Sequence, residues 1–364
     1  MLKKVDKPLL ITIAVLLFFG LLAFSSAALG VLASNEVKFY SIIKNQLIFA
    51  LLGGVIAISL GIIIPYRLYE RFGYHLFFLA LLATTLVFVP GLSIYHGGAH
   101  RWIDLGPVSF QPSELLKMGF VIAVALWCSK NRHLFRSWKY GLLPFAVGSG
   151  LVASIMLAQP DFGTFLIIMT AGTSVFFVGG ARLRHLGIIA FIAIIGFATL
   201  VSFRPYMMER IKTFFNDTHD PRGASWQVNQ SLVAIGSGGL FGRGLGQSVQ
   251  KFNFLPEPIG DSIFAVTAEE LGMLGVLFLL SLYAIVGIRG YMISLNAESQ
   301  FARLLGIGIV TIVLTQTTIN IMSMLGLFPL TGVPLPLISH GGTALMVTLF
   351  ELGVLLQISK TSNL

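Results

Sequence analysis

The stretch Leu9–Ala33, LLITIAVLLFFGLLAFSSAALGVLA, contains no charged side chain. An α-helix needs about 20 consecutive apolar residues to cross the hydrocarbon core of a bilayer, so this stretch predicts a membrane span. It follows Lys3, Lys4 and Lys7, an arrangement that secretory signal peptides share. Its length, and the similar runs that come after it, favour a retained span over a cleaved signal peptide.

The composition of the whole chain extends this prediction. Of the 364 residues, 55% are hydrophobic and only 11% are charged. That much apolar surface does not fit one soluble core, so we predict an all-α, polytopic membrane protein that forms a single domain over residues 1–364. The single cysteine, Cys128, excludes an internal disulfide and a paired-cysteine redox or zinc site.

Apolar runs of span length recur about ten times along the chain. A polar gap at residues 204–261 separates the seventh run from the eighth and predicts one long loop. The predicted helices are residues 9–33, 45–64, 75–91, 112–129, 141–158, 162–179, 185–203, 262–288, 304–326 and 341–358.

The net charge of +9 is explained by membrane orientation, and no nucleic-acid binding is predicted. Cytoplasmic loops carry an excess of Lys and Arg, and alternate short loops of this chain differ strongly in these residues. Both termini are therefore predicted to be cytoplasmic, and the 204–261 loop extracytoplasmic. The cytoplasmic loops hold Arg67, Arg71, Lys130, Arg132, Arg136, Lys139, Arg182, Arg184, Arg289 and Arg303, whereas the short outer loops hold Lys38, Lys44 and Arg101.

Four predicted helices begin at the outer face after a polar junction rich in proline or glycine. Pro112 and Pro160 are expected in first helical turns, where a missing N–H is tolerated. Glu114 and Asp161 are expected in the same turns, where the helix dipole favours an anion. Four such junctions on one face predict an extracytoplasmic site built from several spans. The junctions are FQPSELLK (110–117), AQPDFGT (158–164), PIGDSIF (258–264) and LISHGGTA (337–344).

Charged residues near these junctions are candidates for the chemistry. Glu114 and Lys117 are three residues apart and share a helix face, either as a structural ion pair or as substrate contacts. Arg101 is chemically suited to a phosphate group. His96 and His100 lie in a glycine-rich loop without an obvious third ligand, so no metal site is predicted there.

The predicted outer loop is basic and glycine-rich, which suits an anionic lipid or a lipid-linked phosphate at the membrane interface. Its glycine spacing fits neither a P-loop nor a dinucleotide-binding fingerprint. At its end, Asp261 is placed to accept a proton from a sugar hydroxyl. Glu269 and Glu270 follow, and a paired structural role is one interpretation of them. The basic residues of the loop are Arg204, Arg210, Lys212, Arg222, Arg243 and Lys251.

These residues resemble the SEDS family of shape, elongation, division and sporulation proteins, membrane glycosyltransferases that polymerise lipid II into peptidoglycan. The resemblance runs nearly from end to end of the chain. Within the family, GLGQSVQKFNFLPE (244–257) is more similar to the division and sporulation branch, FtsW and its relatives, than to RodA. The motifs are HRWIDLGPVSFQPSELLK (100–117), QPDFGT (159–164), DPRGASWQVNQSLVAIGSGGLFGRGLGQSVQKFNFLPE (220–257), AVTAEELG (265–272) and GVPLPLISHGG (332–342).

The resemblance implies a role for particular residues. The catalytic aspartate of the family falls on Asp261, which would act as the general base. Two neighbours depart from the family pattern: Ser262 follows the aspartate where phenylalanine is usual, and His340 replaces a tyrosine. His340 either adds a titratable group or bonds as the tyrosine does. The substrate-binding positions would be Arg101, Glu114, Lys117, Asp161, Arg210, Lys251, Glu257, Glu270 and His340.

The implied activity is that of an inverting peptidoglycan glycosyltransferase on the outer face of the bacterial cytoplasmic membrane. Asp261 would deprotonate the 4-hydroxyl of the acceptor, which then forms a β-1,4 link as undecaprenyl pyrophosphate leaves. Arg101, Arg210 and Lys251 would stabilise that pyrophosphate, and a divalent cation, Mg²⁺ or Mn²⁺, could share the task.

The resemblance also implies partners: lipid II, the growing glycan strand, a class B penicillin-binding protein as transpeptidase, and other membrane proteins of division or elongation. Two alternatives stay open, a lipid II flippase and a scaffold without catalytic activity that recruits the transpeptidase. The sequence does not decide between division, elongation and sporulation.

Overall fold

A computed structural model describes residues 5–96, 99–104, 106, 109–131, 137–203, 205–215 and 224–362. Arg132, Arg136, Arg204 and Arg222, which the sequence assigned to loops, lie outside these residues. The elements are α1 (Lys7–Ser34), α2 (Glu36–Leu47), η1 (Ile48–Gly53), α3 (Gly54–Ile63), α4 (Tyr66–Thr85), η2 (Leu86–Phe88), β1 (Ser93–His96), β2 (Ala99–Asp104), β3 (Ser109–Phe110), α5 (Pro112–Lys130), η3 (Trp138–Leu142), α6 (Leu143–Ala158), α7 (Phe162–Val178), α8 (Leu183–Phe203), α9 (Pro205–Phe215), α10 (Ala224–Gly238), α11 (Ile263–Leu295), α12 (Gln300–Met324) and α13 (Gly342–Ser359).

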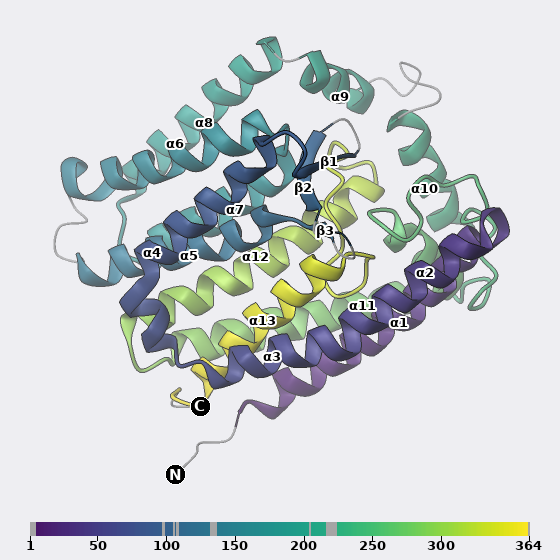
Figure 1. Cartoon of the computed structure of the whole chain (residues 1–364), viewed down its shortest axis with the longest axis horizontal. Helices are drawn as coiled ribbons and strands as arrows, with labels where there is room; N and C mark the ends of the chain where they lie inside the picture. The colour runs from purple at the N-terminus through teal and green to yellow at the C-terminus, as the bar shows by residue number, and fades with distance from the viewer. Residues whose placement is uncertain are drawn as a thin grey trace.

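The protein is polytopic, with most of its long helices aligned along one direction (Figure 1). Within the described ranges, eight helices are long and apolar enough to cross a membrane, and two shorter apolar helices cover Phe162–Val178 and Leu183–Thr199. These helices correspond one to one with the ten predicted spans. The predicted helical membrane fold is confirmed.

The bounds of three predicted helices are wrong. The helix predicted at 262–288 is α11, which ends at Leu295. The helix predicted at 75–91 is α4, which runs from Tyr66 to Thr85. The helix predicted at 45–64 begins at Glu36 and continues from α2 through the π-helical turn η1 into α3. The early starts of α2 and α4 have one cause: an apolar run marks only the part of a helix inside hydrocarbon, whereas polar turns extend it into the interface. The end predicted at 91 is too late because α4 gives way to the 3₁₀ turn η2 after Thr85.

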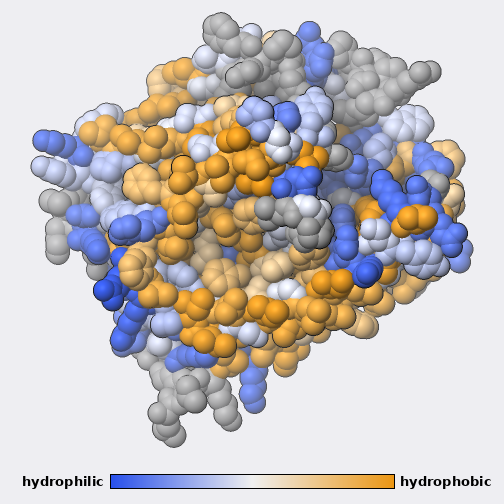
Figure 2. Space-filling view, viewed as in Figure 1, coloured by the Kyte–Doolittle hydropathy of each residue, from blue (hydrophilic) through white to orange (hydrophobic). Residues whose placement is uncertain are grey.

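Three helices form the centre of the bundle. In α5, α12 and α13, 83% of the span is buried inside the protein, compared with 28% in the spans Glu36–Ile63 and Trp138–Ala158. The outer helices therefore present apolar faces outward, as lipid requires. Figure 2 shows the result, a hydrophobic belt over the helices with hydrophilic atoms gathered near its two ends.

The start of α1 and the end of α13 lie at the same end of the bundle (Figure 1). The backbone N–H of Asp6 donates to Ser359 Oγ at 3.0 Å, and the Asp6 carboxylate pairs with Arg289 of α11. The start of α4 is at this end too, because the Tyr66 N–H donates to Gln357 Oε1 at 3.2 Å. Helices α5, α7, α11 and α13 consequently begin at the opposite end, which we call the outer end.

A small antiparallel sheet lies at the outer end, in the order β1-β2-β3. The prediction of an all-α fold with a glycine-rich loop missed this sheet, because strands of two to six residues leave little periodicity to read. Its register pairs Ile103 with both Ser93 and Phe110. The sheet fixes the position of Arg101 in β2.

Helix α11 is interrupted at Gly272, which has φ 66° and ψ −167°. The backbone groups that the break exposes are paired with the segment after α10. The N–H groups of Met273 and Leu274 donate to the carbonyls of Gly239 and Leu240 at 2.9 and 3.2 Å. In the other direction, the carbonyls of residues 269 and 270 of α11 accept hydrogen bonds from the backbone N–H groups of residues 243 and 244. Irregular backbone at membrane depth is tolerated only when its polar groups are satisfied in this way.

The predicted 204–261 loop is thus partly a packed element of the bundle. Helix α10 packs on α11 so closely that a Cβ added to Gly238 would lie 2.2 Å from the Ala268 carbonyl oxygen. Ser248 and Lys251 are each 1% exposed. The sequence predicted a basic loop at the membrane interface over this whole segment. That prediction is wrong for the second half of the segment, which folds back against α1 and α11.

Candidate functional site

A cavity of about 600 Å³ opens at the outer end of the bundle, and we call it the outer cavity. Eight of the ten residues predicted for the site line it, drawn from β2, α5, α9, the turn before α11 and the junctions before α7 and α13. The eight residues are Arg101, Glu114, Lys117, Asp161, Arg210, Glu257, Asp261 and His340.

Helix α5 supplies an ion pair to the floor of the outer cavity. Lys117 Nζ lies 2.9 Å from Glu114 Oε2, and both side chains are almost fully buried. The Lys117 ammonium also donates to Gln316 Oε1 of α12 at 2.7 Å. Pro112 is the first residue of α5, as predicted, so Glu114 lies in the first turn. The pair thus faces the cavity while α12 restrains the ammonium.

Asp161 is the N-cap of α7 and lies before its first turn, which corrects the prediction. Its Oδ1 accepts from the Thr164 N–H at 3.3 Å, and its Oδ2 accepts from Gln111 Nε2 at 3.4 Å. Pro160 consequently precedes the helix. An aspartate at an N-cap satisfies an otherwise unpaired N–H, so a structural role accounts for these contacts.

Two arginines line the outer cavity, one from β2 and one from α9. Arg101 donates to the carbonyls of Gln159 and Pro160 at the junction before α7. Arg210 of α9 donates to the carbonyl of Leu330. Each guanidinium has five N–H donors in a planar group, and these backbone contacts position it at the wall of the cavity.

Asp261 lies in the turn before α11 and is held from several sides. Gln227 Nε2 donates to Asp261 Oδ1 at 3.1 Å and to Ser262 Oγ at 2.9 Å. Asn320 Nδ2 donates to the Asp261 carbonyl at 2.8 Å. Ser262, which departs from the family pattern, is fully buried and shares the Gln227 amide with the carboxylate.

The environment of Asp261 changes its acidity. Removal from water, with a smaller contribution from the nearby Glu257 carboxylate, raises the pKa of Asp261 to about 6. The hydrogen bond from Gln227 opposes this rise because it stabilises the charged form. An acid with this pKa is mostly ionised at pH 7 and is a better proton acceptor than an ordinary aspartate.

His340 fixes the turn that carries Asp261. Its backbone N–H donates to the Ile259 carbonyl at 2.7 Å, and its ring nitrogen Nδ1 lies 3.1 Å from Gln46 Oε1. The ring stacks on Phe24 with centroids 5.6 Å apart. Burial lowers the pKa of His340, so the ring is neutral at pH 7 and acts as a hydrogen-bonding group.

The structure does not bring Lys251 and Glu270 into the outer cavity. Lys251 Nζ lies 2.7 Å from Glu270 Oε1, and the side chains are 0% and 2% exposed. Ser26 Oγ of α1 donates to the same carboxylate at 2.7 Å. This buried cluster joins α1, the 248–251 turn and α11, so Lys251 is not placed to contact a pyrophosphate in the cavity.

Glu269 has the structural role that the sequence offered as one interpretation. Its carboxylate accepts from the backbone N–H groups of Val249 and Gln250 at 3.0 and 3.3 Å. Ser248 Oγ donates to it at 2.6 Å, and Arg243 Nε lies 3.5 Å away. Glu269 and Glu270 together fasten the 248–251 turn to α11.

Two observations concern metal ligands near the site. Among the described residues, no group of three or more His, Cys, Asp or Glu side chains is placed to hold a metal ion. His100 Nδ1 lies 2.8 Å from Ser93 Oγ, while the His96 side chain is outside the described part of the chain.

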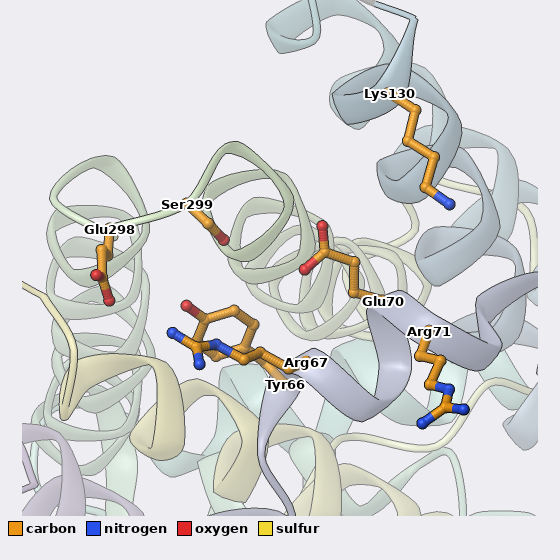
Figure 3. A pocket seen from close by; sticks show the side chains of 7 residues that line it. All are labelled: Tyr66, Arg67, Glu70, Arg71, Lys130, Glu298 and Ser299. Carbon is orange, nitrogen blue, oxygen red and sulfur yellow. The ribbon is translucent and has the colours of Figure 1, made fainter.

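A second cavity has a volume of about 520 Å³ and contains none of the residues predicted for the site. Figure 3 shows the residues that line it, which are Tyr66, Arg67, Glu70, Arg71, Lys130, Glu298 and Ser299.

Sequence reasoning missed three amide side chains that organise the site. Gln316 and Asn320 are four residues apart on α12, so they share a face, and they donate to the carbonyls of Pro334 and Val333. Gln227 holds the carboxylate itself. Two amide side chains four residues apart inside the apolar run 304–326 were a signal from which Gln316 and Asn320 could have been predicted.

Comparisons with known proteins identify the family of the chain. The profile of the FtsW/RodA/SpoVE family, described as cell cycle proteins, matches residues 7–364. The chain is 36% identical to stage V sporulation protein E of Bacillus subtilis (strain 168), with 99% of each protein covered. It is also 36% identical to the probable peptidoglycan glycosyltransferase FtsW of Trichlorobacter lovleyi, with 98% of this chain and 94% of that protein covered.

Solved structures are similar along the same length. Rod shape determining protein RodA of Thermus thermophilus superposes with a TM-score of 0.72 at 29% identity, covering 99% of this chain and 98% of that one. A chain from a structure described as "Structural coordination of polymerization and crosslinking by a peptidoglycan synthase complex" gives a TM-score of 0.78 at 28% identity, covering 98% and 97%.

Proposed function

Because this chain belongs to the FtsW/RodA/SpoVE family, we propose that it is a peptidoglycan glycosyltransferase of the inner membrane that polymerises lipid II into β-1,4-linked glycan strands. The observation that carries the proposal is the outer cavity, where the Asp261 carboxylate shares one space with cationic side chains of three different elements. A base and an anion-binding surface are what this transfer requires.

The reaction assigns one step to Asp261. Its carboxylate accepts the proton of the acceptor sugar's 4-hydroxyl as that oxygen attacks the anomeric carbon of the donor. The bond from this carbon to the diphosphate oxygen breaks, and undecaprenyl diphosphate leaves with the bonding electrons. Attack opposite the leaving group inverts the anomeric centre and gives the β-link.

The leaving diphosphate gains negative charge, and three cations of the outer cavity suit it. Arg101 and Arg210 supply the planar donor pattern that binds phosphate oxygens in pairs. Lys117 supplies an ammonium from the floor of the cavity. In this proposal Lys117 takes the role that the sequence gave to Lys251, since Lys251 is paired elsewhere.

A divalent cation fits the same place. Mg²⁺ is usually held by one or two carboxylates together with substrate phosphates, and Asp261 and Glu257 both line the outer cavity. A cation bound there would neutralise charge on the diphosphate. The proton transfer from the acceptor hydroxyl is a task of the protein carboxylate.

We further propose that both termini are cytoplasmic and that the chain works as one domain. The termini share an end with Arg67, Arg71 and Lys130, as the excess of basic residues on the cytoplasmic side predicts. A class B penicillin-binding protein would supply the transpeptidase, which is consistent with the similarity to a structure of a peptidoglycan synthase complex. Other division or elongation proteins would join them.

The test of the proposed function is glycan synthesis by the purified chain. Lipid II is incubated with the protein and its cognate transpeptidase, whose active-site serine is replaced, and the glycan products are separated by length. We expect strands of many disaccharides. Movement of labelled lipid II across vesicles without polymer would favour the flippase, and neither result in the presence of a bound partner would favour the scaffold.

The rate should depend on pH through the Asp261 carboxylate. Because only the ionised form accepts a proton, kcat/KM should rise as pH increases through about 6 and then level off. Glu257→Gln removes a neighbouring negative charge and should move the midpoint to lower pH, whereas Gln227→Leu removes a stabilising hydrogen bond and should move it to higher pH. A midpoint that neither variant moves would show that Asp261 does not control the profile.

A further inference from the structure

The small sheet at the outer end contains a β-bulge beside the outer cavity. The register of β1 and β2 pairs Ile94 with Trp102. The next residue of β1, Tyr95, pairs with His100, so Arg101 is an extra residue of β2 without a partner on β1. A bulge interrupts the alternation of side chains along a strand and redirects one of them, and bulges are frequent next to active sites. The reaction proposed above uses Arg101 and gives no role to Trp102.

The bulge brings Arg101 and Trp102 to the same side of the sheet. Trp102 shares a face with its cross-strand partner Ile94, and both residues line the outer cavity. In a regular strand, Arg101 would lie on the other face together with the buried Ile103. Arg101 nevertheless lines the outer cavity as well. A guanidinium and an indole are therefore neighbours in one wall of the cavity.

Trp102 does not have the surroundings of a membrane anchor. Interfacial tryptophans lie at the level of the lipid headgroups, with one part of the ring in an apolar and the other in a polar environment. Trp138 at the start of η3 fits that description, since it is 58% exposed at the inner end of the bundle. Trp102 is instead half-buried and lines a cavity, so anchoring does not account for its position.

A phenyl ring also lines the outer cavity, but on the side of α13. Phe49 of η1 lies against the start of that helix, because a Cβ built on Gly342 would be 2.5 Å from the Phe49 ring. Trp102 differs from Phe49 in being the direct chain neighbour of a cation that is proposed to bind the diphosphate. The indole is thus the aromatic surface adjacent to that end of the ligand.

The donor substrate joins the two chemical groups that this pair of side chains suits. A pyranose ring has an apolar face of C–H groups, and the flat face of an indole offers a large apolar surface to it. The first sugar is bonded directly to the diphosphate, so a diphosphate bound by Arg101 keeps that sugar close to the next side chain of β2. Ligand sites usually combine aromatic surface with a few placed polar groups in this way.

We propose that Trp102 is a sugar-binding residue, whose indole stacks on the sugar bonded directly to the diphosphate while Arg101 binds the diphosphate. The ligand class is a sugar linked to a lipid diphosphate. The inference rests on the proposed function for the place of the diphosphate, and it adds a residue that distinguishes substrate from product. The departing lipid diphosphate carries no sugar, so it loses the stacking contact and leaves the cavity more readily than the substrate does.

The experiment compares two lipids that bind without turnover. One is undecaprenyl diphosphate, and the other is the same lipid carrying only its first sugar, without a stem peptide or a second sugar. The Kd of each lipid is measured for wild type, Trp102→Leu and Trp102→Phe. In wild type we expect the sugar to tighten binding roughly tenfold, the scale of an aromatic stacking contact. This gain should vanish in Trp102→Leu and be largely kept in Trp102→Phe, which retains a ring.

The matched control is Trp138→Leu, which removes a tryptophan at the inner end and should leave both Kd values unchanged. Equal weakening of both lipids by Trp102→Leu would overturn the inference, because the effect would then concern the cavity as a whole. A gain from the sugar that survives in Trp102→Leu would overturn it too, as would a wild-type chain that does not bind the sugar-bearing lipid more tightly.

Wild type that shows the expected gain but makes no glycan would contradict the proposed function and leave the inference standing. If Trp102→Leu does not fold, the fluorescence of wild type and Trp102→Phe decides. The sugar-bearing lipid should change the tryptophan fluorescence of wild type more than undecaprenyl diphosphate does, and this difference should be absent from Trp102→Phe, which lacks the indole. A difference of the same size in both proteins, or none in wild type, would overturn the inference.

Discussion

Asp261→Asn is expected to lower the rate of glycan polymerisation by about 10²- to 10⁴-fold, the usual contribution of a general base. Asparagine keeps the size of the side chain and can still contact Gln227, but it cannot accept the hydroxyl proton. The measurement is polymerisation from lipid II with the inactivated transpeptidase present. Binding of undecaprenyl diphosphate without a divalent cation should change little, since its three proposed cationic contacts, Arg101, Arg210 and Lys117, remain.

The matched control is Glu209→Gln, which removes an exposed carboxylate of α9 that does not line the outer cavity. This variant should polymerise at the wild-type rate. Equal rates for Asp261→Asn and Glu209→Gln, in proteins with the same unfolding temperature, would show that another group takes the proton. The outer cavity would then still be a binding site, without an identified base.

Lys251→Met is expected to destabilise the folded protein by about 3–5 kcal/mol, because it leaves the buried Glu270 carboxylate without its cation. The side chains of the pair are 0% and 2% exposed, so solvent does not screen the loss. Three elements meet at this pair, and the effect should appear as a lower unfolding temperature in detergent.

Two further variants make the stability measurement specific. The double variant Lys251→Met with Glu270→Leu removes both charges and should recover most of the lost stability, since replacing a whole buried pair by apolar groups is often neutral. Arg243→Met breaks the 3.5 Å contact between Arg243 Nε and Glu269. The Arg243 side chain is 43% exposed, so the change should lower the free energy of unfolding by at most about 1 kcal/mol. A double variant no more stable than Lys251→Met would refute the assignment of the loss to an unpaired charge.

The spans could be predicted because hydrocarbon demands a fixed length of apolar sequence, and all ten runs became helices. The break at Gly272 could not. Glycine is common in membrane helices, and whether the backbone continues through it depends on partners from distant sequence. Here the partners are the carbonyls of Gly239 and Leu240, which only the folded chain brings to α11.

Most of the site could be predicted from the junctions at which helices begin on one face. Lys251 and Glu270 show the limit of that reasoning, since a charge in a motif does not reveal whether it faces a cavity or another charge. Glu351 shows the opposite case. A carboxylate inside the predicted span 341–358 was visible in the sequence, but its complete burial depends on how α13 is packed.

The break in α11 also separates the turn that carries Asp261 from the part of the helix that crosses the bilayer. A helix of 33 residues is about 50 Å long, well beyond the hydrocarbon thickness of about 30 Å, and a continuous helix would tilt as bilayer thickness changes. The outer segment before Gly272 is instead bonded to residues 239–244, so its position does not depend on a continuous helix across the bilayer. We expect Asp261, in the turn before this segment, to keep its place in membranes of different thickness.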